Sequence, residues 1–286
     1  MTPAPSRVEI ARFPGNKRFA VTFSWDDGTI EDRRLVATMN EWGLKGTFNI
    51  NSGILQPSSH EWAASRVHRD EVAALYAGHE VAIHTTTHPD LSLLDPSQVA
   101  FEVLDDRRAL EDLVGYPVRG MAYPFGKYSP AIVQLLRSLG IVYARTGEQT
   151  NPCFPPADPL AWGTTAHMFT ETIDGHIGSR FEKMRANPHA GGVYFIWGHS
   201  FEFARPENRW AELERRFKPL AGHADVWYCT NIELFDYEIA RQRVVIAANK
   251  RTAFNPTAIA VTLLVDGRAI DIPPGRVVQL ADERRA

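Results

Sequence analysis

Short apolar runs alternate with amphipathic stretches over residues 19–241 of the 286-residue chain. The first run, residues 19–25, is typical of a buried parallel strand, and the stretch after it places Leu35, Val36 and Met39 on one helical face. The same alternation predicts strands at 19–25, 46–50, 79–84, 120–123, 141–144, 162–165, 192–197 and 226–229. It predicts helices at 31–42, 69–77, 95–114, 130–139, 174–185, 207–217 and 232–241. Strands that alternate with helices through short connections indicate parallel strands with right-handed crossovers. We therefore expect an α/β fold, a distorted (β/α) barrel of about seven strands.

The last 45 residues, 242–286, have a different pattern. The runs 244–248, 258–265 and 269–272 are rich in β-branched residues, and Asp266-Gly267 is placed as a tight hairpin turn. A segment this short cannot support a core of its own. We expect two parts, a catalytic barrel over residues 1–241 and a small antiparallel β appendage over 242–286 that packs on it.

Composition narrows the possible partners. With 31 basic and 34 acidic residues the net charge is −3, and no basic stripe is present to follow a phosphate backbone. Neither nucleic acid nor a membrane is an expected partner, and oligomeric state has no sequence signal. No export signal or membrane-spanning run is visible, which predicts a cytoplasmic protein. The two cysteines, Cys153 and Cys229, lack the spacing of a disulfide framework or a zinc-thiolate site.

Reactive side chains follow several of the predicted strands. Asp26 and Asp27 end the first strand, and because neighbouring residues on an extended chain face opposite ways, they can take different roles. The plainer interpretation is a turn followed by a helix cap. His84 ends the third strand and His88 follows it, before Pro89. In a parallel barrel the carboxyl ends of the strands share one mouth. Two imidazoles and one carboxylate there predict a divalent metal site, for zinc, with cobalt, manganese or nickel as alternatives.

These stretches resemble the polysaccharide deacetylase family, carbohydrate esterase family four, over residues of about 19–240. The first two family motifs match residues 22–28 and 84–91, and the third matches 122–126. The resemblance implies Asp27, His84 and His88 as metal ligands and Asp26 as general base. It also implies that the Phe125 amide binds the oxyanion, that Trp162 is the hydrophobic fourth motif, and that His199 protonates the leaving group.

Two positions depart from the family pattern. Ala122 stands where the third motif often has an arginine, and Ala161 where the fourth often has an aspartate. Those side chains would orient the base and the acid. Possible replacements are Asp158, Arg119, Arg145, Arg205 and Glu202; strand alternation makes Arg119 a poor one, since positions 119 and 122 face opposite ways.

The chemistry is consistent with acyl transfer to water. A metal polarises an acyl carbonyl, a carboxylate deprotonates water, and a protonated histidine lets an amine leave. The predicted function is metal-dependent removal of an N-acetyl group, or alternatively an O-acetyl group, from a sugar or short oligosaccharide. Alternatives are an amidohydrolase of the same fold acting on a cyclic imide or ureide, and a non-catalytic relative that binds metal or glycan. Substrate contacts are expected from Trp25, Tyr123, Pro124, Trp162 and Trp197, although core packing is the rival explanation for such residues.

Overall fold

The computed structural model describes residues 5–150, 154–205 and 208–280. By its contacts the chain forms two compact units. One, the barrel unit, comprises Val21–His223 and Tyr228–Ile232; the other, the β unit, comprises the described residues up to Ala20, Ala224–Trp227 and those from Glu233 onward. The bounds of these units differ from the predicted boundary between residues 241 and 242. The division into a catalytic barrel and a β appendage therefore remains a prediction.

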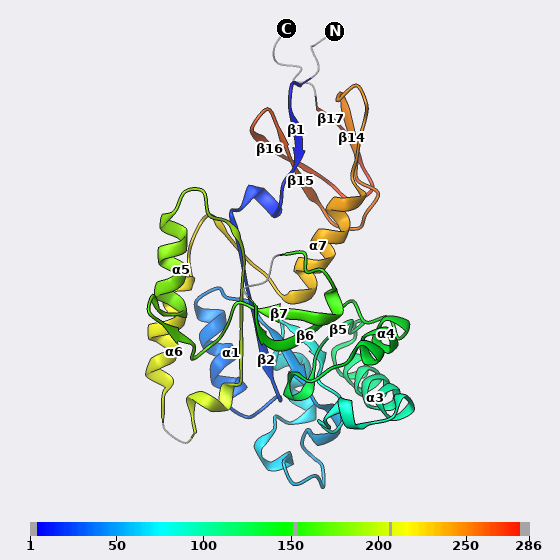
Figure 1. The fold of residues 1–286 in the computed structure, drawn as a ribbon, viewed down its shortest axis with the longest axis vertical. Coiled ribbons are helices and arrows are strands. Elements are labelled where there is room, and N and C mark those ends of the chain that lie inside the picture. Colours follow the sequence, from blue (N-terminus) through cyan, green and yellow to red (C-terminus); the bar gives the residue numbers. More distant parts are fainter. Residues whose placement is uncertain (1–4, 151–153, 206–207, 281–286) are drawn as a thin grey trace. The chain divides into compact units, whose positions relative to one another are not determined.

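Parallel strands form the centre of the barrel unit (Figure 1). Six neighbour one another in chain order: β2 (Phe19–Asp26), β3 (Thr47–Ile50), β4 (Glu80–Ile83), β5 (Gly120–Ala122), β6 (Tyr143–Gln149) and β7 (Trp162–Thr164). On the other side of β2 follow β11 (Gly192–Gly198) and then β8 (Ala166–His167), while β12 (Val226–Tyr228) also pairs with β2. Only Thr165 separates β7, which pairs with β6, from β8, which pairs with β11. This bent segment joins the two edges, so the sheet closes and the predicted (β/α) barrel of about seven strands is confirmed.

Helices lie outside these strands (Figure 1). They are α1 (Asp32–Glu41), α2 (Val72–Leu75), α3 (Pro96–Val114), α4 (Pro130–Ser138), α5 (Ile177–Ala186) and α6 (Trp210–Phe217). Helix α3 begins at Asp95, whose carboxylate caps it in a capping box, and ends at Gly115 with φ of 75°. Its buried stripe includes one charged residue, Asp106. Among the described residues, no helix combines the length and apolar character needed to cross a bilayer.

Two sequence predictions for the helices need correction. The predicted helix at 69–77 is a 3-10 turn followed by only four α-helical residues, because Tyr76, with φ of −94° and ψ of 14°, already leaves helical geometry before the stop expected at Gly78. The start of the predicted helix at 174–185 belongs to a hairpin of β9 (Glu171–Thr172) and β10 (Gly175–His176). His176 then caps α5 with its ring nitrogen.

The β unit contains two antiparallel three-stranded sheets and α7 (Asn231–Arg243), which enters it from the barrel unit. One sheet is β1 (Val8–Ile10), β15 (Val261–Val265) and β16 (Arg268–Ile272); the other is β13 (Val245–Ile246), β14 (Thr252–Phe254) and β17 (Val277–Gln279). Asp266 and Gly267 both have positive φ, so the predicted hairpin turn is confirmed. The core of the unit is Ala253, Leu263, Val265, Ile272 and Leu280. Strand β1, which pairs with β15, was missed because three residues are too few to show alternation.

Of the two cysteines, Cys229 is buried. Cys153 lies outside the described residues. The absence of a disulfide framework or a zinc-thiolate site stays a prediction.

Candidate metal and catalytic site

The carboxylates of Asp26 and Asp27 both face His84. Its Nε2 lies 3.9 Å from Asp26 Oδ2 and 3.6 Å from Asp27 Oδ1. Simple alternation would have separated the two carboxylates, but β2 ends at Asp26, and Asp27 has a φ of 81°. That left-handed residue turns the chain, so its carboxylate joins the same site instead of the opposite face.

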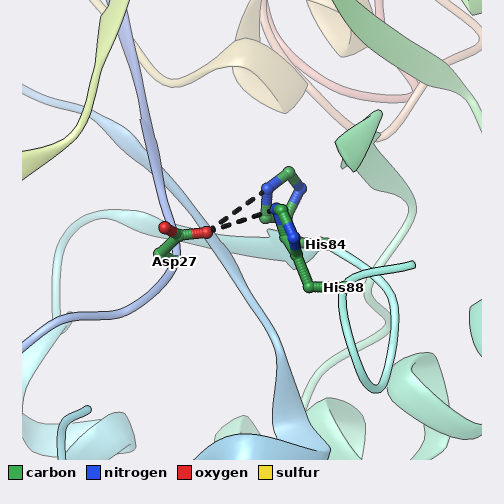
Figure 2. A group of neighbouring side chains, drawn as sticks. All are labelled: Asp27, His84 and His88. Carbon is green, nitrogen blue, oxygen red and sulfur yellow. Dashed lines mark ion pairs between the residues drawn. The ribbon is translucent and has the colours of Figure 1, made fainter. Parts of the chain in front are cut away.

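Asp27, His84 and His88 form the predicted cluster of ligands (Figure 2). Asp27 Oδ1 is 3.6 Å from His84 Nε2 and 3.5 Å from His88 Nε2. His84 Nδ1 donates to the carbonyl oxygen of Ala122 at 2.9 Å, which leaves the Nε2 lone pair directed at the cluster. Burial lowers the pKa of both histidines, that of His88 to about 4, so both are neutral at pH 7.

The chemistry of this donor set fits a divalent cation. Asp27 Oδ1 is buried and accepts no hydrogen bond from the described residues, although a buried carboxylate oxygen normally has a partner. Two neutral imidazole nitrogens beside it complete a ligand set that suits zinc and similar metals. Cation binding would satisfy the oxygen that the protein leaves unpaired.

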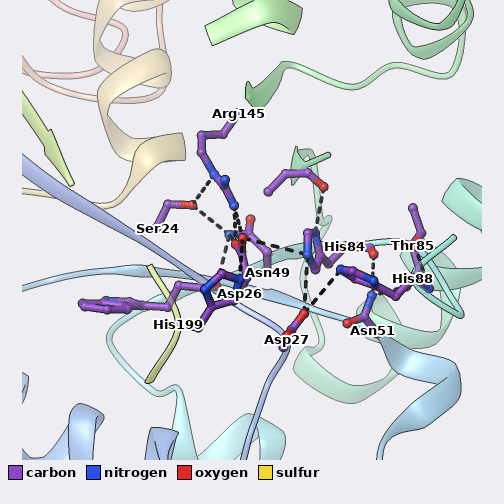
Figure 3. Close-up of polar contacts among 12 residues, drawn as sticks. Ser24, Asp26, Asp27, Asn49, Asn51, His84, Thr85, His88, Arg145 and His199 are labelled. Carbon is purple, nitrogen blue, oxygen red and sulfur yellow. Dashed lines mark hydrogen bonds and ion pairs between the residues drawn. The ribbon is translucent and has the colours of Figure 1, made fainter. Parts of the chain in front are cut away.

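Two residues outside the loop that carries the histidines, Asp106 and Asn51, hold its backbone. The backbone amide of His84 donates to Asp106 Oδ2 on α3 at 3.0 Å, and Asn51 donates its side-chain amide to the carbonyl oxygens of His84 and Thr85 (Figure 3). Thr85 has a φ of 69°, unusual for a β-branched residue, and its hydroxyl accepts from the His88 amide at 3.1 Å. This strained turn brings His88 beside His84, with ring centroids 4.8 Å apart.

Asp26 is paired with Arg145 (Figure 3). Both side chains are buried, and Asn49 also donates to Asp26 Oδ1 at 2.9 Å. Burial alone would raise the pKa of Asp26, but the positive charge of Arg145, helped by His84 and His199, lowers it to about 2. Arg145 is therefore the counter-ion that the sequence left unassigned at Ala122.

His199 is paired with Glu202, three residues further along the chain. His199 Nδ1 lies 2.6 Å from Glu202 Oε1, and its Nε2 lies 3.9 Å from Asp26 Oδ2. Burial would lower the pKa of His199, but the hydrogen bond to Glu202 and the charges of Asp26 and Asp27 raise it. Glu202 thus takes the position expected for the aspartate missing at Ala161. Of the other replacements considered, Asp158 pairs with Arg137 and Arg205 with Glu31.

The backbone amide of Phe125, which is predicted to bind the oxyanion, lies in an unusual turn. Phe125 lies in the 3-10 turn Pro124–Gly126 with a φ of 58°, and within the described residues its amide makes no hydrogen bond. Its ring is 64% exposed and contacts His88 edge-on, with centroids 4.7 Å apart. Phe125 therefore combines an unpaired backbone amide with a ring that contacts His88.

The burial of Trp25, Tyr123 and Trp162 contradicts the prediction that these three aromatic residues contact substrate. The exposed fractions are 1% for Trp25, 1% for Tyr123 and 0% for Trp162, so none offers a face to a ligand. Trp25 packs among Phe23, Phe203 and Phe217 in the core, Trp162 stacks on Phe195, and Tyr123 donates to the Leu160 carbonyl oxygen.

The other two predicted substrate contacts have different surroundings. Pro124 is buried, whereas Trp197 is partly exposed and lies between the guanidinium of Arg145 and the ring of His167. A substrate contact by Trp197 remains a prediction.

Trp62 is an exposed aromatic residue at the site that sequence reasoning missed. It is 40% exposed, and its ring centroid lies 6.1 Å from that of His88. Its loop is tied to the end of β2, because the Val67 amide donates to the Gly28 carbonyl oxygen at 3.0 Å. The sequence places Trp62 between Glu61 and Ala63, and no periodicity in that loop indicates which way the ring faces.

The fold and the site define a (β/α) barrel with a group of side chains that could hold a metal at the carboxyl ends of its strands. The family model for polysaccharide deacetylases matches residues 14–144, which confirms the resemblance inferred from the motifs. A chitooligosaccharide deacetylase from Bradyrhizobium sp. (strain ANU 289) is 38% identical over 65 residues, 22% of this chain and 30% of that protein. The peptidoglycan-N-acetylglucosamine deacetylase PgdA of Listeria monocytogenes is 26% identical over 134 residues, 46% of this chain and 27% of PgdA. The chain thus spans less than a third of the length of these two relatives.

Solved structures agree on the fold. A candidate polysaccharide deacetylase from Mycobacterium smegmatis superposes with a TM-score of 0.59 at 20% identity, over 85% of this chain and 96% of that one. Puue allantoinase gives a TM-score of 0.56 at 17% identity, over 80% and 93% of the two chains. At these identities the likeness concerns the barrel alone.

Proposed function

We propose that this protein is a metal-dependent deacetylase that hydrolyses the N-acetyl group of a sugar or short oligosaccharide. One observation carries the proposal: Asp27 Oδ1, buried and unpaired, faces two neutral imidazoles beside the arginine-paired Asp26. Such an arrangement combines a site for a Lewis acid with an ionised base.

Asp27, His84 and His88 would hold the metal through Oδ1 and the two Nε2 atoms. Zinc suits this set, with cobalt, manganese and nickel as alternatives. When bound, the metal would polarise the acyl carbonyl and lower the pKa of the attacking water. Asp106 and Asn51 hold the backbone of His84, so the ligands need little rearrangement to bind it.

Asp26 accepts the proton of the attacking water. Its pKa of about 2 means that it is ionised at neutral pH, and the buried guanidinium of Arg145 keeps it so. Asn49 and Arg145 both hold Oδ1, while Oδ2 also faces His84 and His199. The base is therefore oriented before substrate arrives.

The Phe125 amide and His199 act after water has added to the acyl carbon, on the oxyanion and on the leaving nitrogen. The unpaired amide donates to the oxyanion formed when water adds to the acyl carbon. His199, whose pKa is raised, keeps Nδ1–H on Glu202 and gives its Nε2 proton to the leaving nitrogen. One proton is thus taken from water by Asp26 and one is delivered by His199, and acetate and a free amine are the products.

The relatives support an acetylated amino sugar as substrate, because the matched proteins are a chitooligosaccharide deacetylase and a peptidoglycan-N-acetylglucosamine deacetylase. Exposed rings at Trp62 and Phe125 suit the apolar face of a pyranose. An O-acetyl sugar is the alternative. The reason for considering a non-catalytic relative was the absence of the family side chains at Ala122 and Ala161. Arg145 and Glu202 make the contacts expected of those side chains, so we do not favour this alternative. The cytoplasmic location remains a prediction, which cell fractionation would test.

The test is acetate release from N-acetyl and O-acetyl sugars of one to five units, before and after chelation and with each metal restored. We expect release from N-acetyl oligosaccharides that stops on chelation and returns with zinc. Ring opening of hydantoin-like compounds, assayed in parallel, covers the amidohydrolase alternative. No acetate from any sugar, or ring opening without acetate release, would refute the proposed function.

A further inference from the structure

One carboxylate oxygen in the site accepts from two histidines. Glu202, in the 3-10 turn Ser200–Phe203, places Oε1 2.6 Å from His199 Nδ1 and 3.1 Å from His167 Nε2. His167 ends β8, so its imidazole comes from the segment that closes the barrel. The three side chains lie within 4.8 Å of one another, and each is only partly exposed. The proposed acid thus shares its carboxylate with a second imidazole.

The hydrogen bonds around His167 fix its tautomer. Its Nδ1 accepts from the Phe169 amide at 3.3 Å, so the proton of the neutral ring is on Nε2 and points to Glu202. Trp197 packs edge-on against the same ring, with centroids 4.9 Å apart, and restricts its rotation. His167 is therefore a fixed donor to Oε1.

We propose that His167 is a positioning residue that shares Glu202 with His199 and thereby limits how tightly His199 holds its proton. Because a carboxylate that already accepts one hydrogen bond stabilises a second donor less strongly, His167 makes Glu202 a weaker partner for the imidazolium. An acid that binds its proton too tightly would release it slowly to a leaving nitrogen. The inference rests on the proposed function, in which His199 is that acid.

Hydrogen bonding also lowers the pKa of Glu202 to about 2 against the effect of burial, which is consistent with two donors at one carboxylate. Other charges face His199 as well. Asp26 and Asp27 from the end of β2 favour its protonated form, while Arg145 from β6 is paired with Asp26. A metal held by Asp27 would oppose protonation. None of these groups changes when His167 is replaced, so a difference between variants reports on His167.

The experiment is a titration of the His199 ring by side-chain ¹⁵N NMR in the zinc-loaded protein. His167→Phe removes the donor and keeps an aromatic ring beside Trp197; His167→Gln keeps a donor that can reach Glu202. We expect His167→Phe to raise the His199 pKa by about one unit, a tenfold tighter proton. The His167→Gln protein should stay close to wild type, and Glu202→Gln should lower the His199 pKa. His189→Phe, an exposed histidine before the amino end of β11, is the matched control and should change nothing.

An unchanged or lower His199 pKa in His167→Phe, with wild-type thermal unfolding, would overturn the inference. Should His167→Phe fold poorly, a His199 pKa in the His167→Gln protein that departs from wild type by a full unit would also overturn it. The pKa on the basic side of the pH profile of kcat/KM for acetate release is an independent measurement. If the NMR pKa of His199 shifts as expected but the kinetic pKa does not, His167 still adjusts the His199 pKa, and the proposal that His199 is the acid is refuted.

Discussion

Ala122 and Arg145 lie directly opposite each other in the parallel pairing of β5 with β6. Paired residues on neighbouring strands place their side chains on the same side of the sheet, so Arg145 and Ala122 share one face. The guanidinium of Arg145 reaches Asp26 and forms a buried ion pair. The positive partner of the base has thus moved one strand along the sheet, and the small side chain at 122 is consistent with that move.

Arg145→Ala should impair both stability and activity. Asp26 would keep a buried charge without its partner, which typically costs about 3–5 kcal/mol of the free energy of unfolding. We expect kcat/KM to fall at least about a hundredfold, because the base is then neither ionised as readily nor oriented. Denaturant unfolding and acetate release measure the two effects.

The double variant Arg145→Ala, Ala122→Arg supplies the arginine from the neighbouring strand. It should recover at least about tenfold of the activity lost in Arg145→Ala. Arg137→Ala, which breaks the half-exposed pair with Asp158, is the control and should cost at most about 1 kcal/mol. A double variant no better than Arg145→Ala would show that the arginine does not act through Asp26 alone.

Removing the ligands should remove the metal. In His84→Ala, His88→Ala, two of three ligand atoms are lost, and we expect less than about a tenth of the wild-type metal content by elemental analysis. His79→Ala is the control, because His79 is also largely buried but pairs with Asn40 and the Gly46 amide. Full metal occupancy in the double variant would refute the ligand assignment.

The sequence predicted the barrel well because β2 and α3 carry strong local signals. Residues 19–25 are followed by a helix with the short connection of a β-α unit, and Asp95-Pro96 marks the start of α3. The hairpin at Asp266-Gly267 was equally local. The strand that the sequence missed depends on distant pairing: β1 is three residues long, and its partner strand β15 lies more than 250 residues later in the chain.

The site followed the same division. That Asp27, His84 and His88 lie together could be predicted because these residues end or follow strands in two motifs. Arg145 and Glu202 were only two of five possible replacements, since their roles depend on the register of β5 with β6 and on a turn after β11. Trp25, Tyr123 and Trp162 were misassigned because position near a strand end does not reveal burial.

The pH dependence of kcat/KM should be bell-shaped with a broad top. On the acid side, activity should fall as pH drops through the lowered pKa values of His84 and His88, the latter about 4, because a protonated histidine cannot bind metal. Asp26, with a pKa of about 2, protonates only at lower pH. On the basic side, activity should fall as pH rises through the His199 pKa, which lies above 6.5. A basic limb that survives unchanged in His199→Ala would contradict this assignment.

Asp26→Asn separates the base from the metal ligands. The variant should keep its metal, because Asp27 and the histidines are intact, yet lose about two to four orders of magnitude in kcat. His199→Ala should cost less with aryl acetates than with N-acetyl sugars, since a good leaving group needs little protonation. Loss of metal in Asp26→Asn, measured by elemental analysis, would show that both aspartates bind it.

Asp106 connects α3 to the backbone at His84, and Asp106→Ala should lower both the stability of the protein and its affinity for metal. Its carboxylate accepts from the amides of Ser52 at 2.7 Å and His84 at 3.0 Å, and burial raises its pKa to about 7. Removing it leaves two buried donors unpaired, which costs about 2–4 kcal/mol of the free energy of unfolding. Asp106→Asn keeps an acceptor oxygen and should cost about half as much. Equal stability of Asp106→Ala and wild type in denaturant would refute this role.

Trp62 should make the rate depend on the length of the sugar chain. Its ring is exposed, lies beside His88, and is held by a loop tied to the end of β2, so little ordering is needed when a sugar stacks on it. A stacked pyranose next to the acetylated one should improve kcat/KM about tenfold. We therefore expect Trp62→Ala to lose about tenfold in kcat/KM on N-acetyl trimers and tetramers and much less on the monomer, while Trp62→Phe retains most of the gain.

Tyr116→Ala is the matched control for Trp62→Ala. Tyr116 is also 40% exposed, but its hydroxyl accepts from the amide of Val81 near the amino end of β4, away from His84. The measurement is acetate release from N-acetyl sugars of one to five units, and equal losses at every length in Trp62→Ala would mean that the ring supports the loop without touching the substrate.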